Sequence, residues 1–176
     1  MIYPFLCAVL PAVDPAQPPA MTVPEFDELV KEELSAGLFA RMISWGDPAA
    51  EVKVPLYSAM RQFQDYLHYR IAQLRAEKLK INPLFEEPAE FFGEVDYALN
   101  IAVSAPSPLE RERIVDAACW RKMDDLETGH DMDFEYLCIY RLRLGLLQKY
   151  TGRDEENGRK NFEAALEKLA AAFNEP

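Results

Sequence analysis

The chain has 176 residues, of which 49% are hydrophobic and 28% charged, so its length and composition are those of one ordinary folded domain. Its 19 basic and 30 acidic residues give a net charge of −11 at pH 7, which argues against binding to nucleic-acid phosphates or to an anionic membrane surface. The sequence has no basic block and no apolar run of membrane-spanning length. We therefore expect a cytoplasmic protein with no direct membrane insertion.

The first 21 residues predict a short extended segment. Pro4 and Pro11 interrupt the apolar opening, and the first basic residue is Lys31, so a targeting signal is not expected. Residues 11–21 hold four prolines, which cannot sustain a helix or a central strand. We expect residues 1–21 to pack in extended form on a single helical domain that covers residues 1–176.

Stretches of apolar residues at helical spacing predict an all-α fold, a helical bundle or array of about six helices. The clearest stretch runs from Pro55 to Ile81 and would be about 40 Å long. The first expected helix begins at the capping box of Thr22 and Glu25 and stops at Gly37, and the next two cover residues 55–81 and 88–103. The fourth follows the capping box Ser107–Glu110 and ends at Gly129, and the fifth runs from Asp131 or Asp133 to Thr151. The sixth is a surface helix that Asp154 caps, and its apolar stripe consists of Phe162, Ala165, Leu166, Leu169 and Phe173.

Motifs typical of metal, cofactor or catalytic sites are missing from the sequence. Cys7, Cys119 and Cys138 are widely spaced and are predicted to be reduced, buried thiols. The segment His130–Asp133 fits a polar turn with an N-cap better than a metal site of histidine and carboxylates. There is also no glycine-rich phosphate loop and no nucleophile motif. We expect no cofactor, no metal and no enzymatic activity.

Five basic residues are the candidates for contact with a partner. Arg61, His68 and Arg75 are seven residues apart and so line one flank of the long helix, where they meet either the acids of a partner or the surplus acids of this chain. Arg141 and Arg143 lie in the most apolar predicted helix, where a guanidinium needs a carboxylate. That carboxylate comes either from a subunit interface or from an acid of this chain, with three candidates: Asp124, Asp125 and Glu127.

Three parts of the sequence resemble an uncharacterised bacterial family that is encoded within V/A-type ATPase operons. They are the opening Tyr3–Leu6 with Leu10 and Pro11, the segment Leu74–Leu79 of the long helix, and Trp120–Glu127 followed by Phe134, Tyr140, Arg141 and Leu142. The family occupies the operon place of the all-helical stalk component that seats the rotor shaft on the membrane ring and has no catalytic residues.

The resemblance implies a non-catalytic subunit or assembly factor of a bacterial V/A-type rotary ATPase. Its partners would be other ATPase subunits, and it would be cytoplasmic, peripheral to the membrane through the complex. The alternatives are a helical binding or regulatory module unrelated to the ATPase, with a homodimer left open, and an enzyme with a dispersed carboxylate site.

Overall fold

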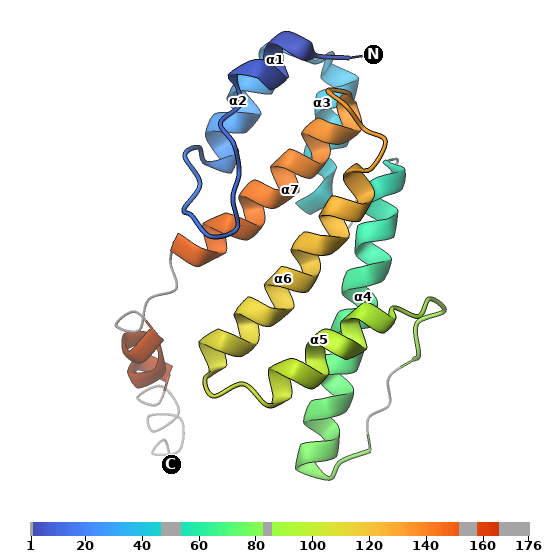
Figure 1. Cartoon of the computed structure of the whole chain (residues 1–176), viewed down its shortest axis with the longest axis vertical. Coiled ribbons are helices and arrows are strands. Elements are labelled where there is room, and N and C mark those ends of the chain that lie inside the picture. Colours follow the sequence, from blue (N-terminus) through green and yellow to red (C-terminus); the bar gives the residue numbers. More distant parts are fainter. Residues whose placement is uncertain (1, 47–53, 83–85, 152–157, 166–176) are drawn as a thin grey trace, which may run out of the picture.

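The fold is all-α, as the sequence predicts. The computed structural model describes residues 2–46, 54–82, 86–151 and 158–165 (Figure 1). Up to Thr151 these residues form seven α-helices and one 3-10 helix, Ser44–Gly46, so eight helical elements replace the expected total of about six. The described ranges contain no β-strand, although an isolated antiparallel bridge joins Ile2 to Asp133.

The predicted extended conformation of residues 1–21 is wrong at its start, because Pro4–Val9 forms helix α1. Pro4 lies in the first turn, where its fixed φ suits a helix and its missing N–H costs nothing. Leu10 then returns the backbone to an extended conformation. Residues 11–21 contain neither helix nor strand, as predicted, and Leu6 is the buried residue that anchors α1 to the core.

Helix α2 (Val23–Glu33) begins at the predicted capping box. The hydroxyl of Thr22 accepts the N–H of Glu25, and the carboxylate of Glu25 accepts the N–H of Thr22 at 2.7 Å. Gly37 does not stop this helix, which ends before the extended residue Leu34. Ser35 instead caps a helix that the sequence pattern does not predict, α3 (Ala36–Ile43), by accepting the N–H of Leu38.

Helix α4 (Pro55–Leu79) is the predicted long helix, and it ends at the left-handed residue Lys80 rather than at Ile81. Helix α5 (Gly93–Val103) begins later than the predicted residue 88. Phe92 retains an extended backbone directly before α5, and its ring packs edge-on against that of Phe63 of α4, with the two ring centroids 5.4 Å apart. The hydrophobic contact thus fixes where α5 can begin.

Helices α6 (Pro108–Glu127) and α7 (Phe134–Thr151) form an antiparallel hairpin. Ser107 caps α6 as predicted, by accepting the N–H of Glu110 at 3.1 Å. Of the two predicted caps for α7, Asp133 is the correct one, since its carboxylate accepts the N–H of Tyr136 at 2.8 Å. The turn between the helices contains Gly129 at a φ of 90°, a value that favours glycine.

Helix α7 lies at the centre of the molecule, between α6 and the group formed by α1, α2 and α3 (Figure 1). Its side chains are buried on several faces, as its continuous apolar run predicts. Helices α4 and α5 pack on the other side of α6. Residues 158–165 are helical and exposed, Phe162 among them, whereas the predicted cap Asp154 and the stripe beyond Ala165 fall outside the described residues.

Candidate protein-interaction surface

A groove of about 830 Å³ lies where α4, α5 and α6 meet. It is formed by the C-terminal half of α4, the end of α5 and the first half of α6, at the lower end of the molecule in Figure 1. Six of its twelve lining residues are apolar, three are basic and three are acidic. The apolar residues are Ile71, Leu74, Leu99, Ala102, Val103 and Val115.

The three basic residues of the groove form no ion pair within the described part of the chain, although three acids line the same groove. Arg75, Lys78 and Arg111 are exposed, and no carboxylate of that part lies within 4.0 Å of their charged nitrogen atoms. The guanidinium of Arg111 donates a long bond, 3.5 Å, to the carbonyl of Ala105. By contrast, two acids of the groove, Glu112 and Asp116, already take part in contacts inside the chain, and Asp116 is buried.

The predicted basic flank of α4 leads into this groove. Residues seven apart share a helix face, so Arg61, His68 and Arg75 form one column, and Arg75 also lines the groove. Arg61 lies over the ring of Trp45 at 5.9 Å, while His68 and Arg75 are exposed. The column forms no ion pair with the acids of the described residues, including its neighbour Asp65. Of the two interpretations left open by the sequence, pairing with the chain's own acids is not observed among the described residues, and contact with a partner stays a prediction.

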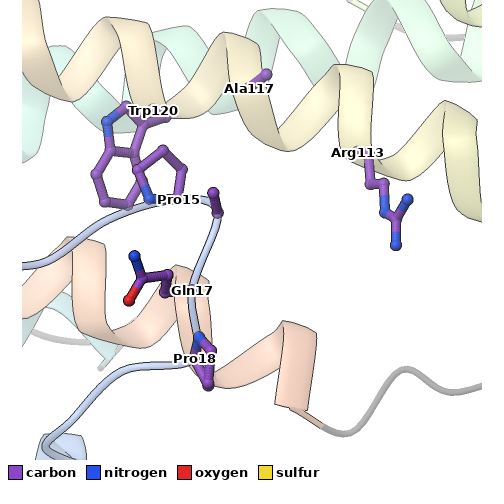
Figure 2. A pocket seen from close by; sticks show the side chains of 7 residues that line it. Pro15, Gln17, Pro18, Arg113, Ala117 and Trp120 are labelled. Carbon is purple, nitrogen blue, oxygen red and sulfur yellow. The ribbon is translucent and has the colours of Figure 1, made fainter.

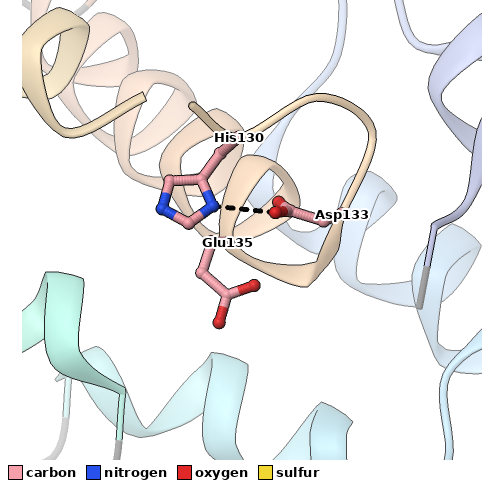
Figure 3. A group of neighbouring side chains, drawn as sticks. All are labelled: His130, Asp133 and Glu135. Carbon is pink, nitrogen blue, oxygen red and sulfur yellow. Dashed lines mark hydrogen bonds and ion pairs between the residues drawn. The ribbon is translucent and has the colours of Figure 1, made fainter. Parts of the chain in front are cut away.

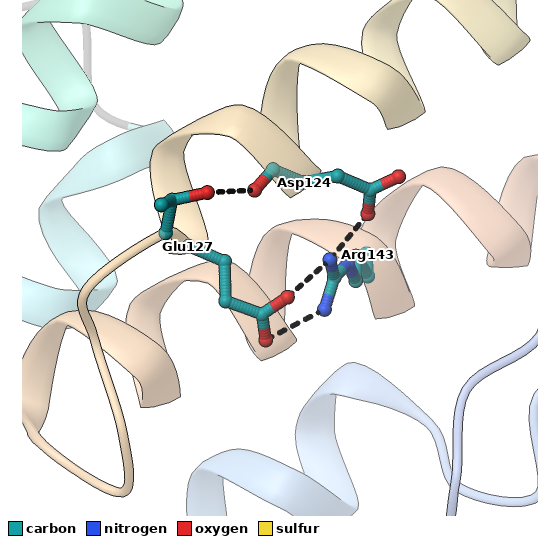
Figure 4. A network of polar contacts seen from close by, with 4 residues as sticks. Asp124, Glu127 and Arg143 are labelled. Atoms are coloured by element: carbon teal, nitrogen blue, oxygen red, sulfur yellow. Dashed lines mark hydrogen bonds and ion pairs between the residues drawn. The ribbon is translucent and has the colours of Figure 1, made fainter.

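Arg143 is paired with acids of this chain, which is one of the two alternatives that the sequence left open for it (Figure 4). Its guanidinium donates to both oxygens of Glu127, at 2.9 and 2.6 Å, and to Asp124 at 2.5 Å. Burial opposes the charge of Arg143, but the bonds to the two carboxylates outweigh it and raise the pKa of Arg143. The guanidinium carbon of Arg143 lies over the ring of Trp120, 5.3 Å from the ring centroid.

Arg141 also pairs internally, although not with any of the three predicted acids. It holds Asp27 of α2 through two bonds, Nε to Oδ1 at 2.7 Å and a terminal guanidinium nitrogen to Oδ2 at 2.9 Å. This bidentate pair ties α2 to α7 across 114 residues of sequence. Arg141 and Arg143 are thus engaged within the fold and do not belong to the candidate surface.

The turn before α7 and the first turn of α7 bring together the one group of possible metal ligands found among the described residues. Donor atoms of His130, Asp133 and Glu135 lie within 4.8 Å of one another (Figure 3). Nδ1 of His130 lies 2.7 Å from one oxygen of Asp133, and the other oxygen caps α7. Burial raises the pKa of Asp133, but these bonds outweigh it, so the pKa is lowered overall. One oxygen of Asp133 thus contacts His130 of the turn, and the other makes the predicted N-cap bond.

A second hollow, of about 550 Å³, lies between the proline-rich loop and α6. Figure 2 shows Pro15 beside Trp120, with Gln17 and Pro18 farther along the loop and Arg113 on α6. Its walls come from a loop and one helix, and Arg113 supplies its only charged side chain. This hollow therefore offers fewer polar contacts to a ligand than the groove does.

The cysteines match the predicted reduced state, and two of the three are buried. Burial raises the pKa of the Cys119 thiol to about 11 and that of the Cys138 thiol to about 12. Both thiols are protonated at neutral pH, and a protonated thiol is a poor nucleophile. Cys7 is only half-buried, and burial again raises its pKa.

Comparisons of the chain with family models, with curated proteins and with solved structures found no significant match. No helix of the described residues is both long and apolar enough to cross a membrane. The groove and the basic column of α4 are the surface features of the described residues that suit contact with another molecule.

Proposed function

We propose that this chain is a non-catalytic component of a larger assembly and acts through helix-to-helix contacts. The observation that carries the proposal is the groove between α4, α5 and α6, where an apolar floor lies beside three cations without an internal carboxylate partner among the described residues. A surface of this kind suits recognition of a second protein, which supplies both the apolar contact and the missing charges.

We propose further that the assembly is a bacterial V/A-type rotary ATPase, in which the chain serves as a cytoplasmic subunit or assembly factor at the membrane periphery. The support is the resemblance of three sequence segments to the family encoded in these operons. One of those segments, Leu74–Leu79, contains Arg75 and Lys78 of the groove. An all-helical chain is also what a stalk component of this kind requires.

Purification of the tagged chain from its native host under gentle extraction tests this function. Wild-type protein is expected to recover ATPase subunits, and the double substitution Arg75→Glu with Arg111→Glu is expected to lose them. Arg121→Glu is the matched control, because Arg121 is an exposed arginine on the opposite face of α6 from Glu112 of the groove. Failure of the wild-type chain to recover any component of the ATPase would contradict the proposal.

A homodimeric binding module is the second candidate, and the exposed face of α1 favours it. Phe5 and Val9 are 89 and 63% exposed and lie one turn apart on α1, and Ile2, which precedes the helix, is 66% exposed, so apolar side chains gather on the surface there. Sedimentation of the purified chain separates the candidates. A dimer that Phe5→Ser converts to a monomer would support the second candidate, whereas a monomer for wild type would exclude it.

A further inference from the structure

We call the six apolar residues of the groove its floor and the exposed charged residues its rim; Asp116 is charged but buried. Leu74 of α4, Ala102 of α5 and Val115 of α6 come from three different helices and converge on the same hollow. Val103 lines the groove while 59% exposed, and Leu79, one turn beyond Arg75 on the same face of α4, is 68% exposed. Covering these side chains would remove apolar area from water, which favours a partner with an apolar ridge.

The unpaired cations of the groove suit carboxylates of a partner. Arg75, Lys78 and Arg111 are exposed cations in a chain with eleven surplus acids, yet none has an ion pair within the described residues. Glu77 lies among them, but Glu112 and Asp116 are already engaged. Carboxylates of a partner would thus meet cations that form no ion pair with this part of the chain, which provides complementarity and faster association.

The backbone of the partner is expected to be helical. The apolar floor offers few groups that could bond the N–H and C=O of an extended peptide, and the described residues contain no strand whose edge could pair with one. A helix satisfies its own backbone groups and presents an apolar stripe to such a groove. Fourteen residues separate Arg61 from Arg75, which is about 21 Å of helix, so the basic column is long enough to align a partner helix of four turns.

We infer that the groove and the basic column of α4 bind an acidic amphipathic helix of another protein. Its apolar stripe lies on Leu74, Ala102 and Val115, and its carboxylates, three, four or seven residues apart, face Arg75, Lys78 and His68. The inference deepens the proposed function and rests on it, because it names the chemistry of the segment that the chain recognises. A second copy of this chain is a separate outcome of the test.

Site-specific photo-crosslinking in the native host tests the inference. Benzoylphenylalanine replaces His68 in one variant, Lys78 in a second and, as the control, Arg121 on the far face of α6. Cross-linked peptides are identified by mass spectrometry. The expected result is that the His68 and Lys78 probes capture the same helical segment with acids at helical spacing, and that the Arg121 probe does not. Arg75→Glu should lower the yield at position 78 at least tenfold, whereas Arg75→Lys should leave most of it.

The outcomes separate this inference from the ATPase proposal. Capture of an acidic amphipathic helix that belongs to some other complex supports the inference and contradicts the ATPase role. Recovery of ATPase subunits together with cross-links from positions 68 and 78 to a basic or non-helical segment keeps the ATPase role and overturns the inference. Cross-links to a second copy of the chain, or no cross-links at these positions, also overturn it.

Discussion

Arg143 illustrates how a single charged residue is accommodated in the most apolar helix of the chain. Its side chain is 9% exposed, whereas the side chains of its two partners remain partly in water, Asp124 at 49% and Glu127 at 27%. The cost of burial therefore falls mainly on the guanidinium, and Glu127 provides two of the three hydrogen bonds that oppose it.

Substitution of Glu127 by alanine should therefore destabilise the fold. The buried guanidinium would keep only its bond to Asp124, and removal of one partner from a buried pair costs several kcal/mol. We expect the free energy of unfolding in urea to fall by about 3 kcal/mol, at the lower end of that range because Asp124 remains. The exposed neighbour Asp125 is the control, and Asp125→Ala should change the value by less than about 0.5 kcal/mol. Equal effects of the two substitutions would show that the network contributes little.

Asp133 should contribute a stability that depends on pH. Its bonds to His130 and to the N–H of Tyr136 lower its pKa in the folded chain below the value of about 3.9 for an unfolded aspartate. The contribution of a carboxyl with a lowered pKa is present above the unfolded pKa and is lost as the pH falls through the folded pKa. Between about pH 5 and pH 2 the wild-type chain should consequently lose stability more steeply than Asp133→Asn.

The choice of asparagine separates the charge of residue 133 from its capping role. Asparagine keeps an oxygen that can cap α7, so Asp133→Asn should lose little stability at pH 7, whereas Asp133→Ala loses both functions and should be about 1 kcal/mol less stable there. Urea unfolding at several pH values measures each variant. Parallel curves for Asp133→Asn and the wild type down to pH 2 would contradict the assignment.

At the scale of elements, the sequence predicts helices best where local chemistry marks their ends. The capping residues Thr22 and Ser107 and the proline at residue 55 all mark true helix starts. The missed elements are short: α1 and α3 have six and eight residues, too few for a clear apolar period. The late start of α5 depends on the contact between Phe92 and Phe63, which no local signal reveals.

The candidate surface can likewise be predicted from the sequence only where it depends on local spacing. Helical spacing predicts the column of Arg61, His68 and Arg75, because that column lies within one helix. The groove requires α5 and α6 to pack on α4, so only tertiary structure reveals it. The pairing of Arg141 with Asp27 could not be predicted either, because the two residues are 114 positions apart. The pairing of Arg143 with acids 16 and 19 positions away could be predicted from the sequence.

Leu6, the buried side chain of α1, should contribute to holding this helix on the molecule, beside the bond from the N–H of Tyr3 to the carbonyl of Met132. Leu6 is 5% exposed and packs in the core, whereas its neighbour Phe5 is 89% exposed. We expect Leu6→Ala to lower the free energy of unfolding by about 2 kcal/mol, since it leaves a cavity beneath α1. Phe5→Ala is the control and should change it by less than about 0.5 kcal/mol. Urea unfolding distinguishes them, and an unaffected Leu6→Ala would mean that α1 is not docked in solution.

For the molecule as a whole, the dominant electrostatic property is the net charge of −11. Such a charge keeps a protein soluble and opposes self-association, but it also destabilises the compact state through repulsion among the acids. The paired arginines of α7 are partly shielded from salt by burial, so added salt acts chiefly on the exposed acids.

The melting temperature should accordingly rise with potassium chloride. Between about 0.01 and 0.5 M salt the screening length falls from about 30 Å to a few ångströms, which removes most of the long-range repulsion. A gain of about 1 kcal/mol would raise the melting temperature by about 2–4 °C in a chain of this size. The triple variant Glu32→Gln, Glu33→Gln and Glu90→Gln removes three exposed acids and brings the net charge from −11 to −8, so its melting temperature should rise less. If both proteins respond equally, the salt acts through hydration rather than through net charge, and a fall in either would mean that screened ion pairs outweigh the repulsion.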